Sequence, residues 1–186
     1  MGQVVLYIAS SLDGRVAGAG HDLSWLEPFA DALAGFEAFQ KTLGAAVMGR
    51  TTFDVCASME WAYGALPVRV LTRRAFERPA SLPQIADVAP DAGPLESVVE
   101  SIRRECTSDV WLVGGGDVVA QAIKADVIDR IRLFTIPVVL GEGPLLVPHV
   151  ADSVRRWKLT ATQTFSSGVV ELDLVRDRAS SSGRAG

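Results

Sequence analysis

The sequence has few of the residues from which enzymes build nucleophiles and metal sites. Its 186 residues include two cysteines and two histidines. Cys56 and Cys106 are far apart and belong to no CxxC or other metal-type spacing, and His21 and His149 are isolated from them. This pattern predicts no metal site, argues against a Ser/His/Asp or Cys/His triad, and favours two buried free thiols in a reducing compartment.

The sequence also lacks a long apolar run and an excess of positive charge. No apolar stretch approaches the roughly 18 residues that cross a bilayer. The beginning, MGQVVLYIASSLDG, is apolar only briefly and has no basic flank, which argues against a signal peptide. The net charge of −4 argues against a broad nucleic-acid-binding face. We therefore expect a cytoplasmic protein that binds neither membranes nor nucleic acids.

The composition is that of a globular protein, with 48% hydrophobic and 22% charged residues, and the length favours one domain. Apolar runs rich in β-branched residues alternate with segments of helical periodicity, which predicts an α/β domain with a mixed sheet.

The expected strands are 3–9, 45–49, 66–72, 109–113 and 128–140, with a short strand near 87–89 and a hairpin of 157–165 and 169–176. The expected helices are 29–42, a segment that starts at 50, 95–106 and 117–124. Pro137 predicts an edge or a bulge in the strand 128–140. We expect one domain over 1–176 and a disordered tail over 177–186.

Three consecutive glycines stand out in DVWLVGGGDVVAQAI, between a predicted strand and a predicted helix. A strand, then glycines, then a helix start brings free backbone N–H groups and the positive helix end to one place. Without Cβ atoms, an anion or a flat ring approaches the main chain closely. A tight turn is the alternative explanation, but three glycines at this junction favour contact with a ligand.

Two other strand ends repeat this design. In AVMGRTTFD, Gly49 is followed by Arg50, Thr51 and Thr52 at a predicted helix start. Either threonine can cap that helix, and the arginine suits a phosphate. In VLTRR, a strand ends in Thr72, Arg73 and Arg74, and an arginine pair suits a phosphate monoester. Each motif alone is better explained as a capped helix or a solvated surface pair.

The three strand ends together favour a dinucleotide. Ligands of open α/β sheets bind beyond the carboxyl ends of the strands. Two helix N-termini suit a pyrophosphate and the arginine pair suits a further phosphate, which is the charge pattern of NADPH. A flavin also brings phosphates and a flat ring, but the arginine pair favours NADPH. Such a cofactor would supply the chemistry that the side chains lack.

Six motifs in this order resemble the dihydrofolate reductase-like superfamily: SLDG, DLSWL, VMGRTTF, VLTRR, VWLVGGGDV and PVVLGEGPLL. Within it, the chain is most similar to the reductase domain of riboflavin biosynthesis and to small stand-alone proteins of that type. The likeness runs from about residue 3 to 175. It implies a three-layer α/β/α fold with a mostly parallel central sheet, an antiparallel C-terminal hairpin, and NADPH across the carboxyl edge.

The resemblance also implies a set of cofactor contacts. Gly49, Arg50, Thr51 and Thr52 would hold phosphate, and Leu71, Thr72, Arg73 and Arg74 would take the adenosine side and the 2′-phosphate. Gly114, Gly115, Gly116 and Asp117 would face the pyrophosphate and nicotinamide, with a non-proline cis peptide expected between Gly114 and Gly115. Ala9 would lie beside the nicotinamide carboxamide.

Four further residues are candidates for catalysis or substrate binding. Asp13 follows the first strand as in the riboflavin-type reductases, with a turn aspartate as the alternative. Asp31 lies one residue from the position where dihydrofolate reductases keep their pterin-binding acid, and a helix-opening aspartate is the favoured alternative. Trp25 resembles the aromatic residue of the mobile loop over the nicotinamide, or staples a helix. Trp61 either caps a substrate pocket or packs in the core.

The resemblance implies an NADPH-dependent reductase that passes a hydride to a small heterocycle, either a pterin or a pyrimidine of flavin biosynthesis. No basic cluster is evident for a glutamate tail, which argues against folate, and the HxE and CxxC ligands of a zinc deaminase domain are absent. A nucleotide-binding module or sensor without turnover is the alternative. Relatives of the riboflavin type often pair, so a homodimer through the apolar segment LFTIPVVL is also expected.

Overall fold

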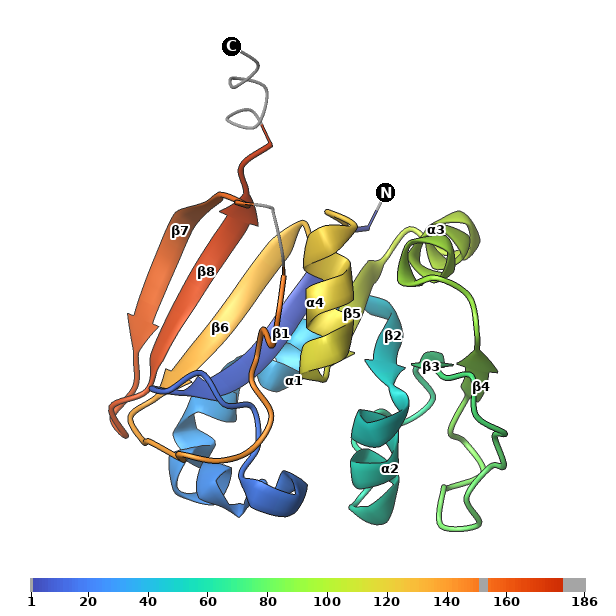
Figure 1. The fold of residues 1–186 in the computed structure, drawn as a ribbon, viewed down its shortest axis with the longest axis horizontal. Helices are drawn as coiled ribbons and strands as arrows, with labels where there is room; N and C mark the ends of the chain where they lie inside the picture. The colour runs from blue at the N-terminus through green and yellow to red at the C-terminus, as the bar shows by residue number, and fades with distance from the viewer. Residues whose placement is uncertain (1, 151–153, 179–186) are drawn as a thin grey trace.

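A computed structural model describes residues 2–150 and 154–178, in which one mixed sheet forms the centre of the protein (Figure 1). Its strands are β1 (Val4–Ser11), β2 (Leu43–Gly49), β3 (Val68–Leu71), β4 (Val88–Asp91), β5 (Asp109–Gly114), β6 (Arg130–Ile136), β7 (Trp157–Thr164) and β8 (Val170–Arg176). They lie in the order β4-β3-β2-β5-β1-β6-β8-β7. Neighbours from β4 to β6 are parallel, whereas β8 pairs antiparallel with both β6 and β7. The predicted mostly parallel sheet with an antiparallel C-terminal hairpin is confirmed.

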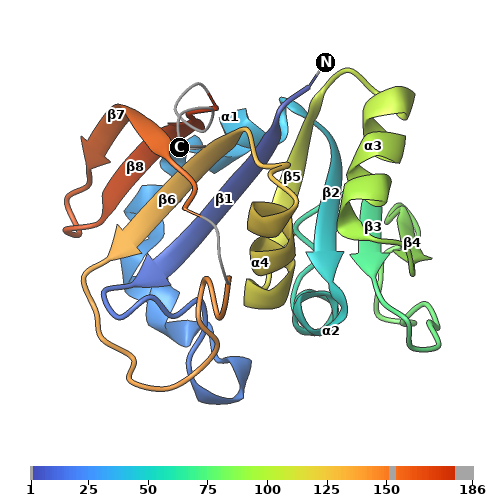
Figure 2. The ribbon, with the colours of Figure 1, turned by 45° about the horizontal axis from the view of Figure 1, so that its top comes forward.

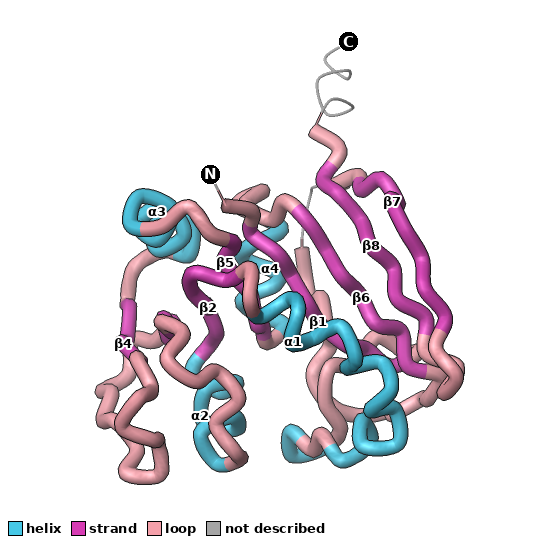
Figure 3. The backbone as a smooth tube through the Cα atoms, turned by 180° about the vertical axis from the view of Figure 1, so that it is seen from behind, coloured by secondary structure: helices cyan, strands magenta, loops and turns pink. Residues whose placement is uncertain are grey.

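Helices cover both faces of the sheet, which gives the predicted three layers (Figures 1 and 3). On one face, η2 (Ser24–Gly35), α1 (Phe36–Gln40) and α2 (Arg50–Ser58) share an aromatic-rich cluster with the strands. On the other face, α3 (Leu95–Glu105) and α4 (Gly116–Lys124) pack through aliphatic side chains. The short helix η1 (Ala19–His21) lies in the loop after β1. The dihydrofolate reductase-like architecture is therefore present.

The central strands are apolar on both sides because they are covered on both sides. Val4, Ala46, Val47, Val110 and Leu112 are fully buried. Their alternate side chains enter the two different clusters, as the period of two in a strand requires. This explains why β1, β2 and β5 read as continuous apolar runs. Met48 and Phe53 are also fully buried.

The predicted helix 29–42 is wrong in type and in bounds. The segment instead begins as the 3₁₀ helix η2 at Ser24, with Pro28 inside it, and becomes α-helical only from Phe36 to Gln40. Phe29 leaves helical geometry at φ −112° directly after the proline. A proline interior to a helix removes a backbone donor and crowds the preceding turn. Leu33, which is at helical spacing from Phe29 and Phe36, is 60% exposed.

The predicted strand 128–140 is too long. β6 ends at Ile136, directly before Pro137, which has no N–H to continue the ladder. Pro137 was predicted to mark an edge or a bulge, but β6 is an inner strand between β1 and β8, and its pairing with both neighbours shows no register shift. The edge on that side is β7. The short strand expected near 87–89 is present as β4.

Several other expectations concern the surface and the chain end. Cys56 and Cys106 are free, as expected, but half-buried and not fully buried. In the predicted tail, Asp177 and Arg178 still contact the domain, since the Asp177 N–H donates to the Arg156 carbonyl at 3.0 Å. The rest of that tail, 179–186, lies outside the described residues. No described helix has the length and apolar character needed to cross a bilayer.

Candidate active site

A cavity of about 710 Å³ opens at the carboxyl edge of the sheet, where β1, β2, β3 and β5 end. Figure 2 shows α2 and α4 beginning at this edge, beneath β2 and beside β5. Nine of the predicted cofactor residues line the cavity: Ala9, Gly49, Arg50, Thr51, Thr52, Leu71, Gly115, Gly116 and Asp117. The structure therefore brings three separate sequence motifs to one cavity, and its volume is in the usual range for ligand sites.

Two helix N-termini face this cavity without a side-chain cap. The N-cap of α2 is Gly49 and that of α4 is Gly115, and neither helix start has a capping side-chain hydrogen bond. Neither threonine therefore caps α2 as predicted. The Thr52 hydroxyl instead accepts a hydrogen bond from the Gly115 N–H at 2.7 Å, which ties the two helix starts together. The remaining N–H groups of the two first turns are a ready site for anions.

The glycines are needed for close approach at this point. A Cβ on Gly116 would lie 2.2 Å from the Leu145 carbonyl oxygen, and one on Gly49 would lie 3.1 Å from Val118. The Gly114–Gly115 peptide is cis, as the sequence resemblance implied, and Gly114 has a φ of +120°. The three glycines thus let the 144–148 segment and a ligand come close to the same stretch of backbone.

One of the predicted arginines lines the cavity and the other two do not. Arg50 lines it, and its guanidinium donates to Asp54 at 2.7 Å and to the Ala75 carbonyl at 3.0 Å. Arg73 and Arg74 are exposed and follow Leu71, which lines the cavity at the end of β3. Within 2–150 and 154–178, no hydrogen bond or ion pair of their guanidinium groups is present, and the Thr72 hydroxyl accepts from the Arg74 N–H at 3.1 Å.

Asp13 is placed as a loop anchor and does not line the cavity. Its carboxylate accepts hydrogen bonds from the Ser11 hydroxyl at 2.6 Å and from the Leu140 and Gly141 N–H groups at 3.0 and 2.9 Å. These bonds, the one from Ser11 foremost, hold the pKa of the Asp13 carboxyl well below its usual range. A carboxylate that stays ionised is a poor proton donor. The geometry favours the turn aspartate over the catalytic role.

Asp31 also lies away from the cavity. It belongs to η2 and reaches the turn between β7 and β8, where it accepts from the Ser166 hydroxyl at 2.8 Å and the Ser167 N–H at 3.0 Å. Hydrogen bonds from these serines lower the pKa of Asp31 to about 2. The structure does not bring Asp31 to the position expected for a pterin-binding acid, because the 3₁₀ geometry turns this segment toward the hairpin.

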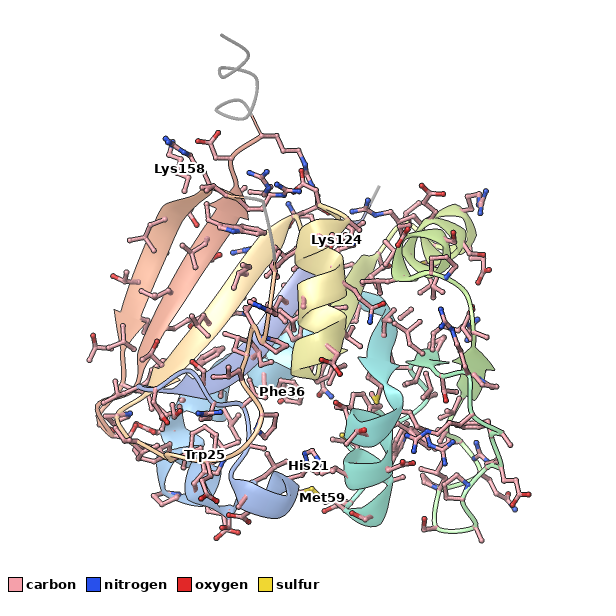
Figure 4. The ribbon with its side chains drawn as sticks, viewed as in Figure 1. His21, Trp25, Phe36, Met59, Lys124 and Lys158 are labelled. Atoms are coloured by element: carbon pink, nitrogen blue, oxygen red, sulfur yellow. The ribbon has the colours of Figure 1, made fainter. Side chains whose placement is uncertain are left out.

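The two predicted substrate tryptophans also do not line the cavity. Trp25 packs against the aromatic cluster beneath the cavity, and its buried indole Nε1 has no hydrogen-bond partner among the described residues. Trp61 donates from Nε1 to the Gly64 carbonyl at 3.1 Å and packs on Tyr63 with 4.7 Å between ring centroids. Figure 4 labels Trp25 among the side chains of the segment after β1, with His21 nearer to α2. The packing alternative fits both residues.

The family model for the RibD C-terminal domain matches residues 3–171. The chain belongs to the RibD C-terminal domain family. It is 30% identical over 186 residues to the uncharacterized protein YwjB of Bacillus subtilis (strain 168), covering 94% of this chain and 98% of that protein. The crystal structure of a putative riboflavin biosynthesis protein from Shewanella sp. PV-4 has a TM-score of 0.82 at 25% identity, covering 96% of this chain and 100% of that one. Dihydrofolate reductase from Enterococcus faecalis, complexed with NADP(H), shares the fold with a TM-score of 0.65 at 20% identity, covering 95% and 97% of the two chains.

In this RibD C-terminal domain, sequence reasoning missed most of the side-chain wall of the cavity. Tyr7 of β1, Trp111 of β5 and Tyr63 before β3 line it, together with Cys56 of α2 and His21 of η1. Tyr7 lies two residues before Ala9, and Trp111 lies three residues before Gly114. This closeness to the predicted cofactor residues was the available signal, but in the sequence alone these aromatic residues cannot be distinguished from ordinary core residues.

Burial keeps the ionisable groups of Tyr7, Tyr63 and Cys56 in this cavity neutral. Burial raises the pKa of Tyr7 to about 12, and burial also raises the pKa of the Tyr63 hydroxyl and of the Cys56 thiol. The thiol and the Tyr63 hydroxyl lie 3.4 Å apart. No group of three or more potential metal ligands occurs among the described residues. These side chains are therefore better suited to packing against a ligand than to acting as nucleophiles or metal ligands.

Proposed function

We propose that the protein is an NADPH-dependent reductase that transfers a hydride to a small heterocyclic substrate. One observation carries the proposal: two uncapped helix N-termini meet a glycine-lined cavity at the carboxyl edge of the sheet. The first turns of α2 and α4 would hold the pyrophosphate, and Ala9 leaves room for the nicotinamide. When bound, NADPH would supply the hydride. Membership in the RibD C-terminal domain family and the shared dihydrofolate reductase fold support this function.

The cavity fits such a cofactor because glycines let a ligand approach the backbone at the helix starts. A Cβ at Gly116 would collide with the Leu145 carbonyl, and a Cβ at Gly115 would lie 3.2 Å from the Thr52 hydroxyl. Arg73 and Arg74 follow the cavity-lining Leu71, and among the described residues their guanidinium groups have no partner, so they would be the groups that meet the 2′-phosphate and distinguish NADPH from NADH. The family resemblance favours a pterin or a pyrimidine of flavin biosynthesis as the substrate.

Titration with NADPH and NADH tests this proposal, with quenching of the tryptophan fluorescence as the signal. We expect NADPH to bind at least about tenfold more tightly than NADH, which corresponds to about 1.4 kcal/mol. The double change Arg73→Ala/Arg74→Ala should remove the preference, whereas Arg104→Ala, an exposed arginine on α3, should leave it intact. If neither nucleotide binds, the reductase proposal is wrong.

A nucleotide-binding module without turnover is the second candidate. It is favoured by Asp13 and Asp31, because both expected acids are held in hydrogen bonds away from the cavity. Tight NADPH binding without NADPH oxidation, across a panel of pterins, pyrimidines and uncharged cyclic ketones, would establish this function instead.

We also propose that the protein forms a homodimer through the strands β6, β8 and β7. Leu133 pairs with Leu172 and Leu159 with Leu174, which places these four leucines on one face of the sheet. Leu159 is 50% exposed, and the hairpin extends beyond α3 and α4 (Figure 1). A monomer mass in size-exclusion chromatography with light scattering would overturn this proposal.

A further inference from the structure

The cavity has a second end, away from the helix N-termini, whose wall is aromatic. Tyr63 and Trp111 pack with 5.3 Å between ring centroids, and the Trp111 indole donates to the Tyr7 carbonyl at 3.2 Å. The Cys56 thiol lies against the Tyr63 hydroxyl. These side chains come from β1, β5, α2 and the segment before β3, so they form one continuous surface. We call Tyr7, Trp111, Tyr63 and Cys56 the aromatic wall.

The charges of the cavity are confined to the opposite end. Among the described residues that line it, only Arg50 and Asp117 carry a formal charge at neutral pH, with His21 exposed at the mouth. Arg50 begins α2 and Asp117 belongs to the first turn of α4, so both lie where the phosphates are proposed to bind. Cys56 is six residues further along α2, about 9 Å at 1.5 Å per residue.

Two basic residues that lie beside cavity-lining residues, Arg132 next to Tyr7 and Arg15 next to Val16, are already engaged. Arg132 donates to Glu171 at 2.6 Å and covers the Tyr7 ring with its guanidinium 4.9 Å from the ring centroid. Arg15 donates to the Gly143 carbonyl at 2.6 Å and lies 3.6 Å from Asp13. A phosphate or carboxylate at the wall would therefore lose its hydration without gaining a cation, which is strongly unfavourable.

The wall also presents little polar surface to a ligand. Tyr7 is 7% exposed and lines the cavity, but its hydroxyl oxygen is buried, without a hydrogen-bond partner among the described residues. The Tyr63 hydroxyl lies against the Cys56 thiol at 3.4 Å. The surface that these side chains offer is therefore mainly ring carbon, which suits a flat and weakly polar ligand.

We propose that the substrate is an uncharged, flat ring that carries a carbonyl or imine to accept the hydride and no phosphate or carboxylate. The ring packs on Trp111 and Tyr63 of the aromatic wall. This inference rests on the proposed NADPH-dependent function, and it departs from a substrate with a ribose phosphate or a glutamate tail. It names a substrate class by the chemistry of the wall.

Calorimetric titration of the NADP⁺-saturated protein with two matched probes tests the inference without turnover. The probes are quinoxalin-2-one and the same ring with a 3-carboxylate. We expect the uncharged probe to bind at least about tenfold more tightly. Equal binding, a preference for the carboxylate, or no binding of either probe by the nucleotide-loaded protein overturns the inference. A failure of NADP⁺ itself to bind counts against the proposed function, and the probe preference of the nucleotide-free protein then tests the inference separately.

A matched pair of variants locates the effect. Val55→Lys puts a cation on the cavity-lining face of α2 and should reduce the preference for the uncharged probe about tenfold, whereas Val55→Met should retain the preference. An unchanged preference in Val55→Lys contradicts the proposal.

Discussion

The two ends of the cavity are built from different parts of the chain. The helix-start end consists of backbone N–H groups and glycines at strand-to-helix junctions, tied together by the bond from Gly115 to Thr52. The aromatic end consists of large side chains from elements that are distant in sequence, with Trp111 in contact with Tyr7 and Tyr63. A site made of backbone tolerates little change in shape, whereas a wall of side chains varies with the residues that form it. In the proposed reductase, one cavity would therefore keep cofactor recognition and substrate recognition at separate ends.

The largest expected effect comes from breaking the aromatic end. Trp111 is 7% exposed and is part of the aromatic-rich core, so Trp111→Ala should lower the free energy of unfolding by about 3–5 kcal/mol. Urea denaturation measures this loss. Trp61→Ala is the control, because Trp61 is half-buried and does not line the cavity, and it should cost less. If both variants lose the same free energy of unfolding, Trp111 is no more important to the stability of the core than Trp61, and the prediction is wrong.

A smaller loss of stability, with a larger loss of nucleotide binding, is expected at the helix-start end. Gly116→Ala places a Cβ 2.2 Å from the Leu145 carbonyl oxygen, so the backbone must shift. We expect the free energy of unfolding to fall by about 1–3 kcal/mol and NADPH affinity to fall at least about tenfold. Gly35→Ala, where the nearest atom would be 3.7 Å away and φ is −89°, should change neither quantity in calorimetry or urea denaturation.

The smallest effect is expected outside both ends, at Asp13. Because the fold lowers the pKa of this carboxyl below its ordinary value of 3.8, its stabilising contribution is present above that pH and is lost as the pH falls toward the folded-state pKa. Asp13→Asn should therefore lower stability at pH 7 and show a shallower decline below pH 4 in urea titrations, with NADPH affinity preserved. Asp87→Asn, whose exposed side chain has no hydrogen bond to a described residue, should keep the wild-type slope. A loss of NADPH binding in Asp13→Asn would restore Asp13 to the site.

The sequence predicted the helix-start end well because its signals are local. Gly49 and 114–116 each follow an apolar strand and precede a helical pattern, and the carboxyl ends of neighbouring parallel strands meet at one edge. The order of motifs also indicated the fold that the RibD C-terminal domain family confirms. The cofactor itself and the roles assigned to these residues remain predictions.

The same reasoning failed where local patterns had more than one explanation. Leu33 matched a helical stripe, but Pro28 turned the segment into a 3₁₀ helix that leaves it exposed. Pro137 suggested an edge or a bulge, but it ends an inner strand. Asp31 lay one residue from a known acidic position, but it bonds to the turn between β7 and β8. The two prolines acted locally, whereas the position of Asp31 was decided by a contact with a distant segment.

The sequence by itself determined the strand-to-helix junctions, the glycine-lined backbone and the two-sided burial of the central strands, because these follow from neighbouring residues and from the period of each element. Only the tertiary structure decided which side chains face the cavity. Tyr7, Tyr63 and Trp111 are indistinguishable from core residues until the parallel register of β1 with β5, and the return of the chain after α2, place them at one end of the same cavity. A wall assembled from separate elements leaves no local pattern, since its members are neighbours only after folding.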